Sequence, residues 1–267
     1  MARHVKLNNV AHKDLRVIIR HGARHGARHE ARHAAAFGDN VGSVLTFPTE
    51  YGDVQREYPI FFRKDPATAQ YQSIALLGLQ KDENLFLQDN RWNARYLPGI
   101  VARGPFLIGF QEQEIDGELR REPVIHVDLD HPRISWTEGE PVFLPHGGNS
   151  PYLDRIATIL NGIREGLALS PAMFAAFEAM NLIEPVNVEI RLNSEEQFNL
   201  RSLFTISEAR LATLDGESLA QLNRAGFLQG AFLVAASLHN VRTLIDMKQR
   251  RRAAGHVEGR VENPIDG

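Results

Sequence analysis

The hydrophobic pattern of this chain changes near residue 150, and that change limits the folds open to it. Between residues 37 and 149, apolar residues come in short runs rich in β-branched and aromatic side chains, separated by turn-forming clusters. Later they recur at helical spacing, as in Leu153, Ile156 and Leu160. Short strands with frequent turns favour antiparallel pairing. The pattern predicts an α+β fold with an antiparallel β-rich N-terminal part and a mostly helical C-terminal part.

Individual strands can be predicted from these runs. Six runs share the strand-like composition, namely 44–47, 58–62, 73–79, 84–87, 105–110 and 124–129. Polar and apolar residues alternate over 12–18, which predicts a further edge strand. In the helical part, alternation over 186–192 predicts a strand, and 200–206 is its expected partner.

Helix starts are marked by capping residues. Ser150-Pro151 begins one helix, and Ser170-Pro171 begins a second that runs to Met180. Three further helices are expected: a short one after Ser207, another over 218–225 and a long one over 230–252. The basic residues that end the long helix complement its dipole.

The expected domain organisation follows from these elements. Residues 1–36 are predicted to be a basic His/Arg-rich arm, residues 37–149 a β-rich region and residues 150–254 a mainly helical region. Residues 37–254 are expected to form one compact domain, and residues 255–267 a disordered tail.

The N-terminal arm holds a four-residue repeat. Residues 20–35 read Arg-His-Gly-Ala twice and then Arg-His-Glu-Ala and Arg-His-Ala-Ala, and six of the 11 histidines fall within residues 1–33. Imidazoles can bind Zn²⁺, Ni²⁺ or Cu²⁺ adventitiously, but without an acidic or thiolate partner they form no closed site. We interpret the repeat as a solvated, low-complexity arm.

Composition excludes several classes of function. The chain has no cysteine, which excludes disulfides, iron–sulfur clusters, thiolate metal sites and cysteine nucleophiles. The net charge of −3 gives no general attraction to nucleic acid or anionic membranes. No apolar run reaches the roughly 20 residues of a membrane span, and the first residues lack a signal-peptide pattern. A cytoplasmic location is expected, with signal-independent export as the alternative.

Several blocks of sequence are typical of one family. They share a collinear order along the chain and fall at residues 7–17, 47–51, 56–62, 75–79, 83–86, 91–98, 104–107, 204–206 and 237–240. This series resembles the bacterial SapC family of surface-layer-associated proteins over roughly residues 5–245. A peptide-transport permease shares the name, and the lack of a membrane span separates this chain from it. The Arg/His repeat is an insertion relative to the family pattern.

The resemblance implies context rather than mechanism. It suggests a link to surface layers and to neighbouring outer-membrane receptors, cupin-like hydroxylases and flavin halogenases, and it brings no catalytic residues. One hypothesis is therefore a SapC-like soluble binding or accessory protein without enzymatic activity and without a cofactor. Its partner would be a peptide, a receptor segment or a pathway enzyme linked to cell-surface or uptake systems.

A binding surface can be predicted for that hypothesis. The segment 91–96 mixes cations with aromatic rings, and stacking of arginine on such rings would clamp a ligand. The candidate ligand-binding residues are Trp92, Arg95, Tyr96 and Arg103. The alternative interpretation is an amphipathic turn that Trp92 anchors over the core.

A metal-dependent oxygenase is the alternative function. His126 and Asp128 share one face of a predicted strand, as two ligands of a facial Fe(II) triad would. His146 or His239 would be the third ligand. A 2-oxoglutarate co-substrate would need a basic residue, for which Arg133 and Arg242 are candidates. The competing interpretation is a strand end where Asp residues cap the backbone. The chain has no Gly-x-Ser-x-Gly elbow and no Walker lysine, so it lacks common hydrolase and nucleotide-binding motifs.

Overall fold

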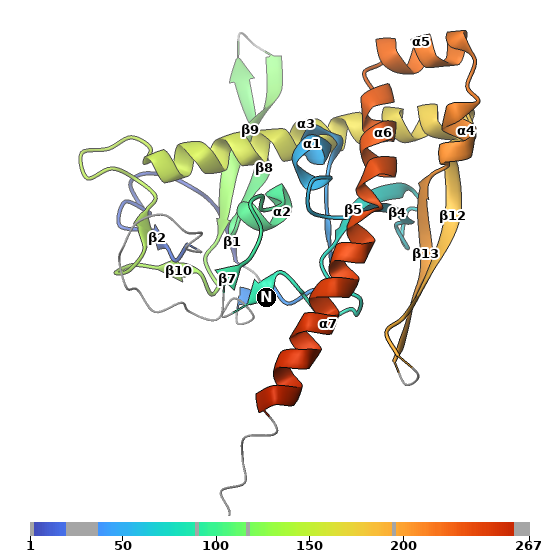
Figure 1. The fold of residues 1–267 in the computed structure, drawn as a ribbon. Helices are drawn as coiled ribbons and strands as arrows, with labels where there is room; N and C mark the ends of the chain where they lie inside the picture. The colour runs from blue at the N-terminus through green and yellow to red at the C-terminus, as the bar shows by residue number, and fades with distance from the viewer. Residues whose placement is uncertain (1–2, 20–36, 89–90, 116–117, 194–195, 259–267) are drawn as a thin grey trace, which may run out of the picture. The chain divides into compact units, whose positions relative to one another are not determined.

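A computed structural model describes residues 3–19, 37–88, 91–115, 118–193 and 196–258 (Figure 1). Helices account for 35% and strands for 29% of the described residues, and the strand pairs among them are antiparallel. The α+β prediction is confirmed. The Arg/His repeat and residues 259–267 lie outside the described residues.

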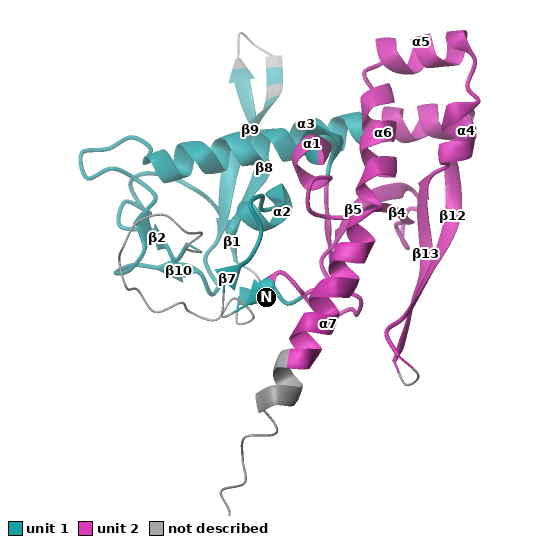
Figure 2. Ribbon diagram, viewed as in Figure 1, with its two compact units in different colours: residues 1–40, 47–50, 87–170 teal, residues 41–46, 51–86, 171–267 magenta. Residues whose placement is uncertain are grey.

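The chain forms two compact units (Figure 2). Unit 1 comprises residues 1–40, 47–50 and 87–170, and unit 2 comprises residues 41–46, 51–86 and 171–267. Each unit therefore takes segments from both sides of residue 150, where the hydrophobic pattern changes.

Unit 1 is built on short sheets. Its main sheet has the order β1 (His4–Lys6), β9 (Glu118–Asp128), β8 (Phe106–Ile115). A small sheet has the order β10 (Ile134–Ser135), β2 (Arg16–Val17), β11 (Glu140–Pro141), and β6 (Leu87–Gln88) pairs with β7 (Arg91–Trp92). Its helical elements are η2 (Pro48–Glu50), α2 (Gly99–Ala102) and residues 151–170 of α3 (Pro151–Ala179).

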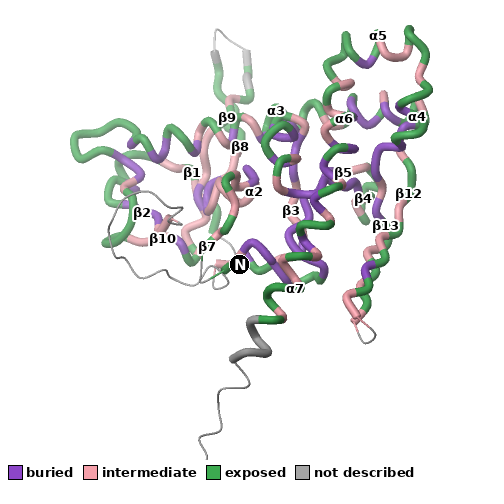
Figure 3. Tube along the Cα trace, viewed as in Figure 1, coloured by how far each residue is buried: buried purple, intermediate pink, exposed green. Residues whose placement is uncertain are grey.

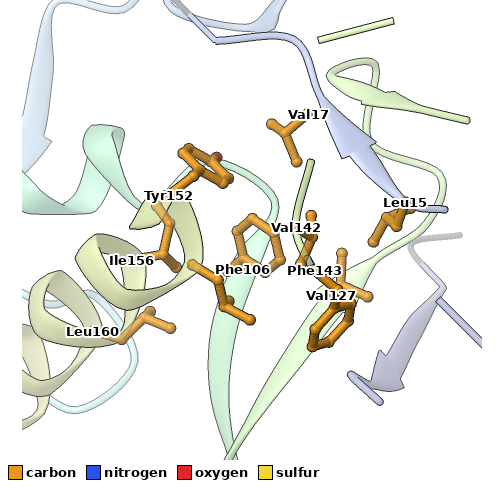
Figure 4. Packing of buried hydrophobic residues seen from close by; sticks show 10 residues of the cluster. Leu15, Val17, Phe106, Val127, Val142, Phe143, Tyr152, Ile156 and Leu160 are labelled. Atoms are coloured by element: carbon orange, nitrogen blue, oxygen red, sulfur yellow. The ribbon is translucent and has the colours of Figure 1, made fainter. Parts of the chain in front are cut away.

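The core of unit 1 joins the main sheet to α3 (Figure 4). Phe106 and Val127, which pair across β8 and β9, are fully buried. The Phe106 ring lies 6.1 Å from that of Tyr152 in the first turn of α3. Ile156 and Leu160 follow at helical spacing on the same buried face. Burial of these side chains fixes the base of β8 and β9.

Unit 2 holds a five-stranded sheet. Its order is β12 (Ile183–Arg191), β13 (Gln197–Ile206), β4 (Ile60–Lys64), β5 (Tyr71–Leu76), β3 (Ser43–Leu45). Its helices are α1 (Tyr51–Val54), α4 (Glu208–Ala212), α5 (Gly216–Arg224), α6 (Leu228–Ser237), α7 (Asn240–Glu258) and residues 171–179 of α3. Phe62 of β4 packs edge-on against Phe174 of α3 at 5.0 Å and stacks with Phe177 at 6.4 Å, and all three rings are buried.

The predicted strand pair of the C-terminal half is confirmed. β12 and β13 pair antiparallel from Ile183 opposite Ile206 to Arg191 opposite Gln197. The short helices predicted after Ser207 and over 218–225 correspond to α4 and α5.

Four predicted elements were wrong in detail. Residues 84–86 of the expected strand 84–87 lie outside any strand, since β6 comprises only Leu87–Gln88. Pro171 does not start a helix but lies inside α3, where its ring nitrogen has no proton to donate to the carbonyl of Leu167, an exposed residue one turn earlier. The long terminal helix is two helices, since α6 ends at Ser237 and α7 begins at Asn240. The expected edge strand over 12–18 is shorter and lies in the middle of its sheet, between β10 and β11.

Tertiary hydrogen bonds explain the break between α6 and α7. The Ser237 hydroxyl accepts the Ile60 amide proton at 2.8 Å, and the Asn240 side chain donates to the carbonyl oxygen of Gln55 at 2.7 Å. Both side chains are buried. These bonds hold the flanks of the break against other segments of unit 2, and local helical pattern does not encode them.

The basic end of α7 has side-chain partners in unit 2. Lys248 forms a partly buried ion pair with Glu83, and its ammonium lies 5.2 Å from the centre of the Phe198 ring. Arg252 pairs with Glu196 at 2.8 Å. These contacts tie α7 to the loop after β5 and to β13, in addition to complementing the helix dipole.

Asn181 ends α3 in a left-handed conformation. Its φ is 53°, the Leu182 amide donates to the carbonyl of Phe177 at 2.9 Å, and the Asn181 amide donates to that of Glu178 at 2.9 Å. This is the Schellman arrangement, in which glycine or asparagine is preferred.

Replacement of Asn181 tests this helix end. We expect Asn181→Val to lower the free energy of unfolding by about 1–2 kcal/mol, because a β-branched side chain clashes with the backbone at positive φ. Asn181→Gly is the matched control and should change it by less than about 1 kcal/mol. Urea denaturation measures both, and equal stability of the two variants would contradict the assignment.

Candidate functional site

The β8–β9 ribbon of unit 1 extends well beyond β1, the third strand of its sheet. β8 and β9 pair over ten positions, from Phe106 opposite Val127 to Ile115 opposite Glu118. β1 covers β9 only opposite residues 126–128. In the order β1-β9-β8, β8 is an edge strand over its whole length. Most of the ribbon is therefore two strands wide.

The register shows which main-chain groups point away from β9. The Asp128 amide donates to the carbonyl of Pro105 at 2.9 Å, so these two residues are a hydrogen-bonded pair. In antiparallel ladders such pairs alternate with pairs whose N–H and C=O groups point outward. The outward-facing residues of β8 are Phe106, Ile108, Phe110, Glu112 and Glu114.

The opposite side of the ribbon supports the same register. The Leu7 amide donates to the carbonyl of Ile125 at 2.9 Å, so Ile125 points toward β1. By alternation, residues 119, 121 and 123 of β9 point the same way, beyond the end of β1. Pro123 has no N–H to offer there, a common protection of strand edges.

The outer edge of β8, meaning its side away from β9, has no such protection. β8 contains no proline, and within the described parts of the chain no strand pairs with this side. Apart from those of Phe106, the outward N–H and C=O groups make no hydrogen bond to described residues. β8 is therefore the edge at which another strand can be added.

Apolar side chains follow the same alternation away from the core. Phe106 is fully buried and Ile108 is partly buried against the core, but Phe110 is 52% exposed and Leu119 on β9 is 76% exposed. Figure 3 shows the ribbon passing from buried to exposed residues. The Arg121 guanidinium lies 5.1 Å from the centre of the Phe110 ring. The face that forms the core at the base thus continues outward through exposed Phe110 before it becomes acidic at Glu112 and Glu114.

Arg103 lies at the start of the outer edge. It follows α2, and its guanidinium donates to the carbonyl oxygen of Phe106 at 2.6 Å. That carbonyl points away from β9, so the guanidinium lies on the outer edge of β8. Burial lowers the pKa of Arg103, and no described acidic side chain forms an ion pair with it. Its remaining N–H donors are available to an anion.

Arg133, in the same unit, is a cation whose contacts are structural. It follows β9, is 4% exposed, and donates to a carboxylate oxygen of Asp39 at 2.6 Å. It also donates to the carbonyl of Ile18 at 3.2 Å and lies 4.2 Å from the centre of the Phe37 ring. Arg133 is thus occupied within unit 1, which leaves it unsuited to the co-substrate role predicted for it.

The predicted ligand residues other than Arg103 have different positions. The Tyr96 hydroxyl donates to a carboxylate oxygen of buried Glu50 at 2.7 Å, and the Gly99 amide donates to the same oxygen at 2.8 Å. This network fixes the start of α2, so Tyr96 has a structural contact. Trp92 is half-buried in β7, and Arg95 is exposed. Arg103, by contrast, is bonded to the edge strand.

The predicted metal ligands do not form a metal-binding cluster in the described structure. His126 and Asp128 share a strand face as expected, but Asp128 accepts main-chain bonds from Arg3 at 3.0 Å and Asp130 at 3.1 Å. The His126 ring packs on Gly109, and the buried Nδ1 of His126 has no hydrogen-bond partner among the described residues. Among the described residues, no three His, Asp or Glu side chains are placed to hold one metal ion.

The two candidates for the third ligand are also placed by the structure. His146 is exposed in the loop before α3, in unit 1. His239 belongs to unit 2, where its Nδ1 bonds the carbonyl of Ala236, and Arg242 follows it in α7.

Comparison with known proteins identifies the family. The SapC family model matches residues 7–244, nearly the whole chain. The chain belongs to the SapC family. No curated protein and no solved structure matches it. In the described parts of this SapC protein, each helix is too short or too polar to cross a membrane.

The open edge carried a sequence signal that strand prediction alone did not use. Over 106–115 the residues at alternate positions are Phe106, Ile108, Phe110, Glu112 and Glu114, so one strand face changes from apolar to acidic. Such a change indicates that the strand leaves the core. The sequence cannot show which neighbour is missing, because pairing partners are distant along the chain.

His131 beside this site gives a pH-dependent prediction. Its Nδ1 accepts the Arg133 amide proton at 3.1 Å. Burial and the Arg133 cation lower the pKa of His131 below its ordinary 6.5, so the folded protein holds it neutral. The unfolded chain binds the extra proton first as the pH falls. Stability from His131 is thus present above pH 6.5 and is lost as the pH falls toward the folded-state pKa.

We expect His131→Asn to flatten the fall in unfolding free energy just below pH 6.5, because the amide oxygen keeps an acceptor without titrating. Urea denaturation across this pH range measures the slope. His146→Asn, on an exposed loop, is the matched control. An unchanged slope in His131→Asn would contradict the buried neutral histidine.

Proposed function

We propose that this SapC-family protein is a binding protein that adds an extended segment of a partner protein to the outer edge of β8. The role is binding, because the edge supplies main-chain donors and acceptors. The link to surface layers that the SapC resemblance implies supports an accessory role beside a cell-surface or uptake partner.

One observation carries the proposal: the outward N–H and C=O groups of Ile108, Phe110, Glu112 and Glu114 have no partner among the described residues. Strand addition satisfies such groups in register and is a common mode of peptide recognition. Each new bond contributes about 0.5–1.5 kcal/mol. A ribbon two strands wide is only marginally stable alone, so a third strand would also stabilise it.

Side chains on the edge strand indicate what the added segment contains. Phe110 is exposed, and Glu112 and Glu114 follow on the same face, while β8 has no basic residue. Directly opposite residues in a sheet interact, and opposite charges stabilise the pair. The added strand should therefore place an apolar residue beside Phe110 and basic residues beside the two glutamates.

Synthetic peptides test strand addition. Two libraries of acetylated, amidated nonapeptides have Thr at even positions and Val, Ile, Leu or Phe at three odd positions. Lys occupies the first and third positions in one library and the seventh and ninth in the other, which covers both strand directions. We expect binders, and we expect the amides of Ile108, Phe110 and Glu112 to gain protection from hydrogen exchange measured by NMR.

Proline substitutions provide the matched controls. Glu112→Pro removes an outward N–H of β8 and should weaken peptide binding at least roughly fivefold. Glu112→Ala separates loss of the side chain from loss of the donor. Arg121→Pro, directly opposite on the other edge, should bind the peptides like the parent. Absence of binding at millimolar peptide, or equal loss in both proline variants, would refute strand addition at β8.

A further inference from the structure

Resting on the proposed strand addition, we infer that the added segment is the C-terminal end of a partner chain, antiparallel to β8, with its terminal carboxylate bound by Arg103. The inference names the direction of the segment and its chemistry. It follows from where Arg103 lies on the edge and from its lack of an acidic partner among the described residues.

The position of Arg103 sets the place of the carboxylate. Its guanidinium bonds the outward carbonyl of Phe106, the first residue of β8. A strand added antiparallel to β8 runs toward that first residue, so its C-terminal end arrives beside Arg103. A parallel strand would bring its N-terminal ammonium there instead, next to a like charge.

Among the described residues, a carboxylate compensates the charge of Arg133, and none compensates that of Arg103. Both guanidinium groups are desolvated enough to lower their pKa values. The guanidinium of Arg133 lies 2.6 Å from a carboxylate oxygen of Asp39, whereas that of Arg103 donates to the neutral carbonyl of Phe106. Within the described chain, Arg103 has no ion pair. A desolvated cation gains most from an anion that enters its site.

A carboxylate suits the donors that remain. The guanidinium presents five N–H groups in a planar fork, and the bond to Phe106 uses one of them. A fork of this shape binds the two oxygens of a carboxylate in parallel. Arg103 is half-buried rather than enclosed, so a chain end can reach it.

The register then predicts the side-chain pattern of the segment. Opposite residues share a strand face. With the terminal residue beside Phe106, alternate residues toward its N-terminus lie beside Ile108, Phe110, Glu112 and Glu114. The pattern is therefore apolar at the terminal residue and the next two alternate positions, and basic at the two before them. The library with Lys at its first and third positions has this order.

The decisive comparison is between free-acid and amidated forms of that library. We expect the free acids to bind the unmodified protein roughly tenfold to a hundredfold more tightly than the amides, as measured by fluorescence anisotropy. Free acids should also shift the Arg103 Nε–H resonance, and amides should not. Arg103→Gln should remove the preference for the acid and keep the affinity for the amide. Retained amide binding also shows that the variant's ribbon is folded.

The outcomes separate this inference from the proposed function. Equal affinity for acids and amides, with both lost in Glu112→Pro, would overturn carboxylate capture and leave strand addition standing. Tighter binding of the library with Lys near its C-terminus would overturn the antiparallel direction. Failure of every peptide form to bind would overturn strand addition, and carboxylate capture with it.

Discussion

The register of β8 against β9 is the constraint on which the candidate site depends. Because Pro105 and Asp128 form a hydrogen-bonded pair, alternate residues of β8 must turn their main-chain groups either to β9 or away from it. A shift of one residue would turn Phe106 out of the core and exchange the groups at the open edge. Burial of Phe106 and Val127 against α3 therefore fixes the register, and the register fixes what the edge offers.

Two arginines of unit 1 differ in whether a described side chain compensates their charge. Arg133 is enclosed by Asp39, the carbonyl of Ile18 and the Phe37 ring, so its charge is compensated inside the unit. Arg103 is also desolvated, but its guanidinium donates to the carbonyl of Phe106 in β8. Residue type alone does not distinguish them, because both are arginines just beyond the end of an element of unit 1, Arg103 after α2 and Arg133 after β9. Their difference arises from which segments pack around each guanidinium.

Periodicity predicted the fold where a single face is buried over several residues. The β12–β13 pair alternates clearly, and its strands and their pairing followed from the sequence. Prediction failed where a local signal was overridden. Pro171, expected to start a helix, lies inside α3, and the break between α6 and α7 is held by bonds of Ser237 and Asn240 to distant residues. For the site, the sequence picked out Arg103 among four candidates but gave no reason to separate it from Tyr96, which bonds Glu50.

The sequence by itself determined the α+β class, most strands and helices, the SapC family and the absence of cysteine chemistry, because these depend on composition, local periodicity and the order of motifs. Tertiary structure alone decided that β8 has an open edge, that Arg103 lies on it, and that the predicted metal ligands in the described chain form no cluster. The physical reason is that hydrogen-bond partners and charge compensation come from residues far apart in the chain. Only folding shows which of those groups are paired and which are left open.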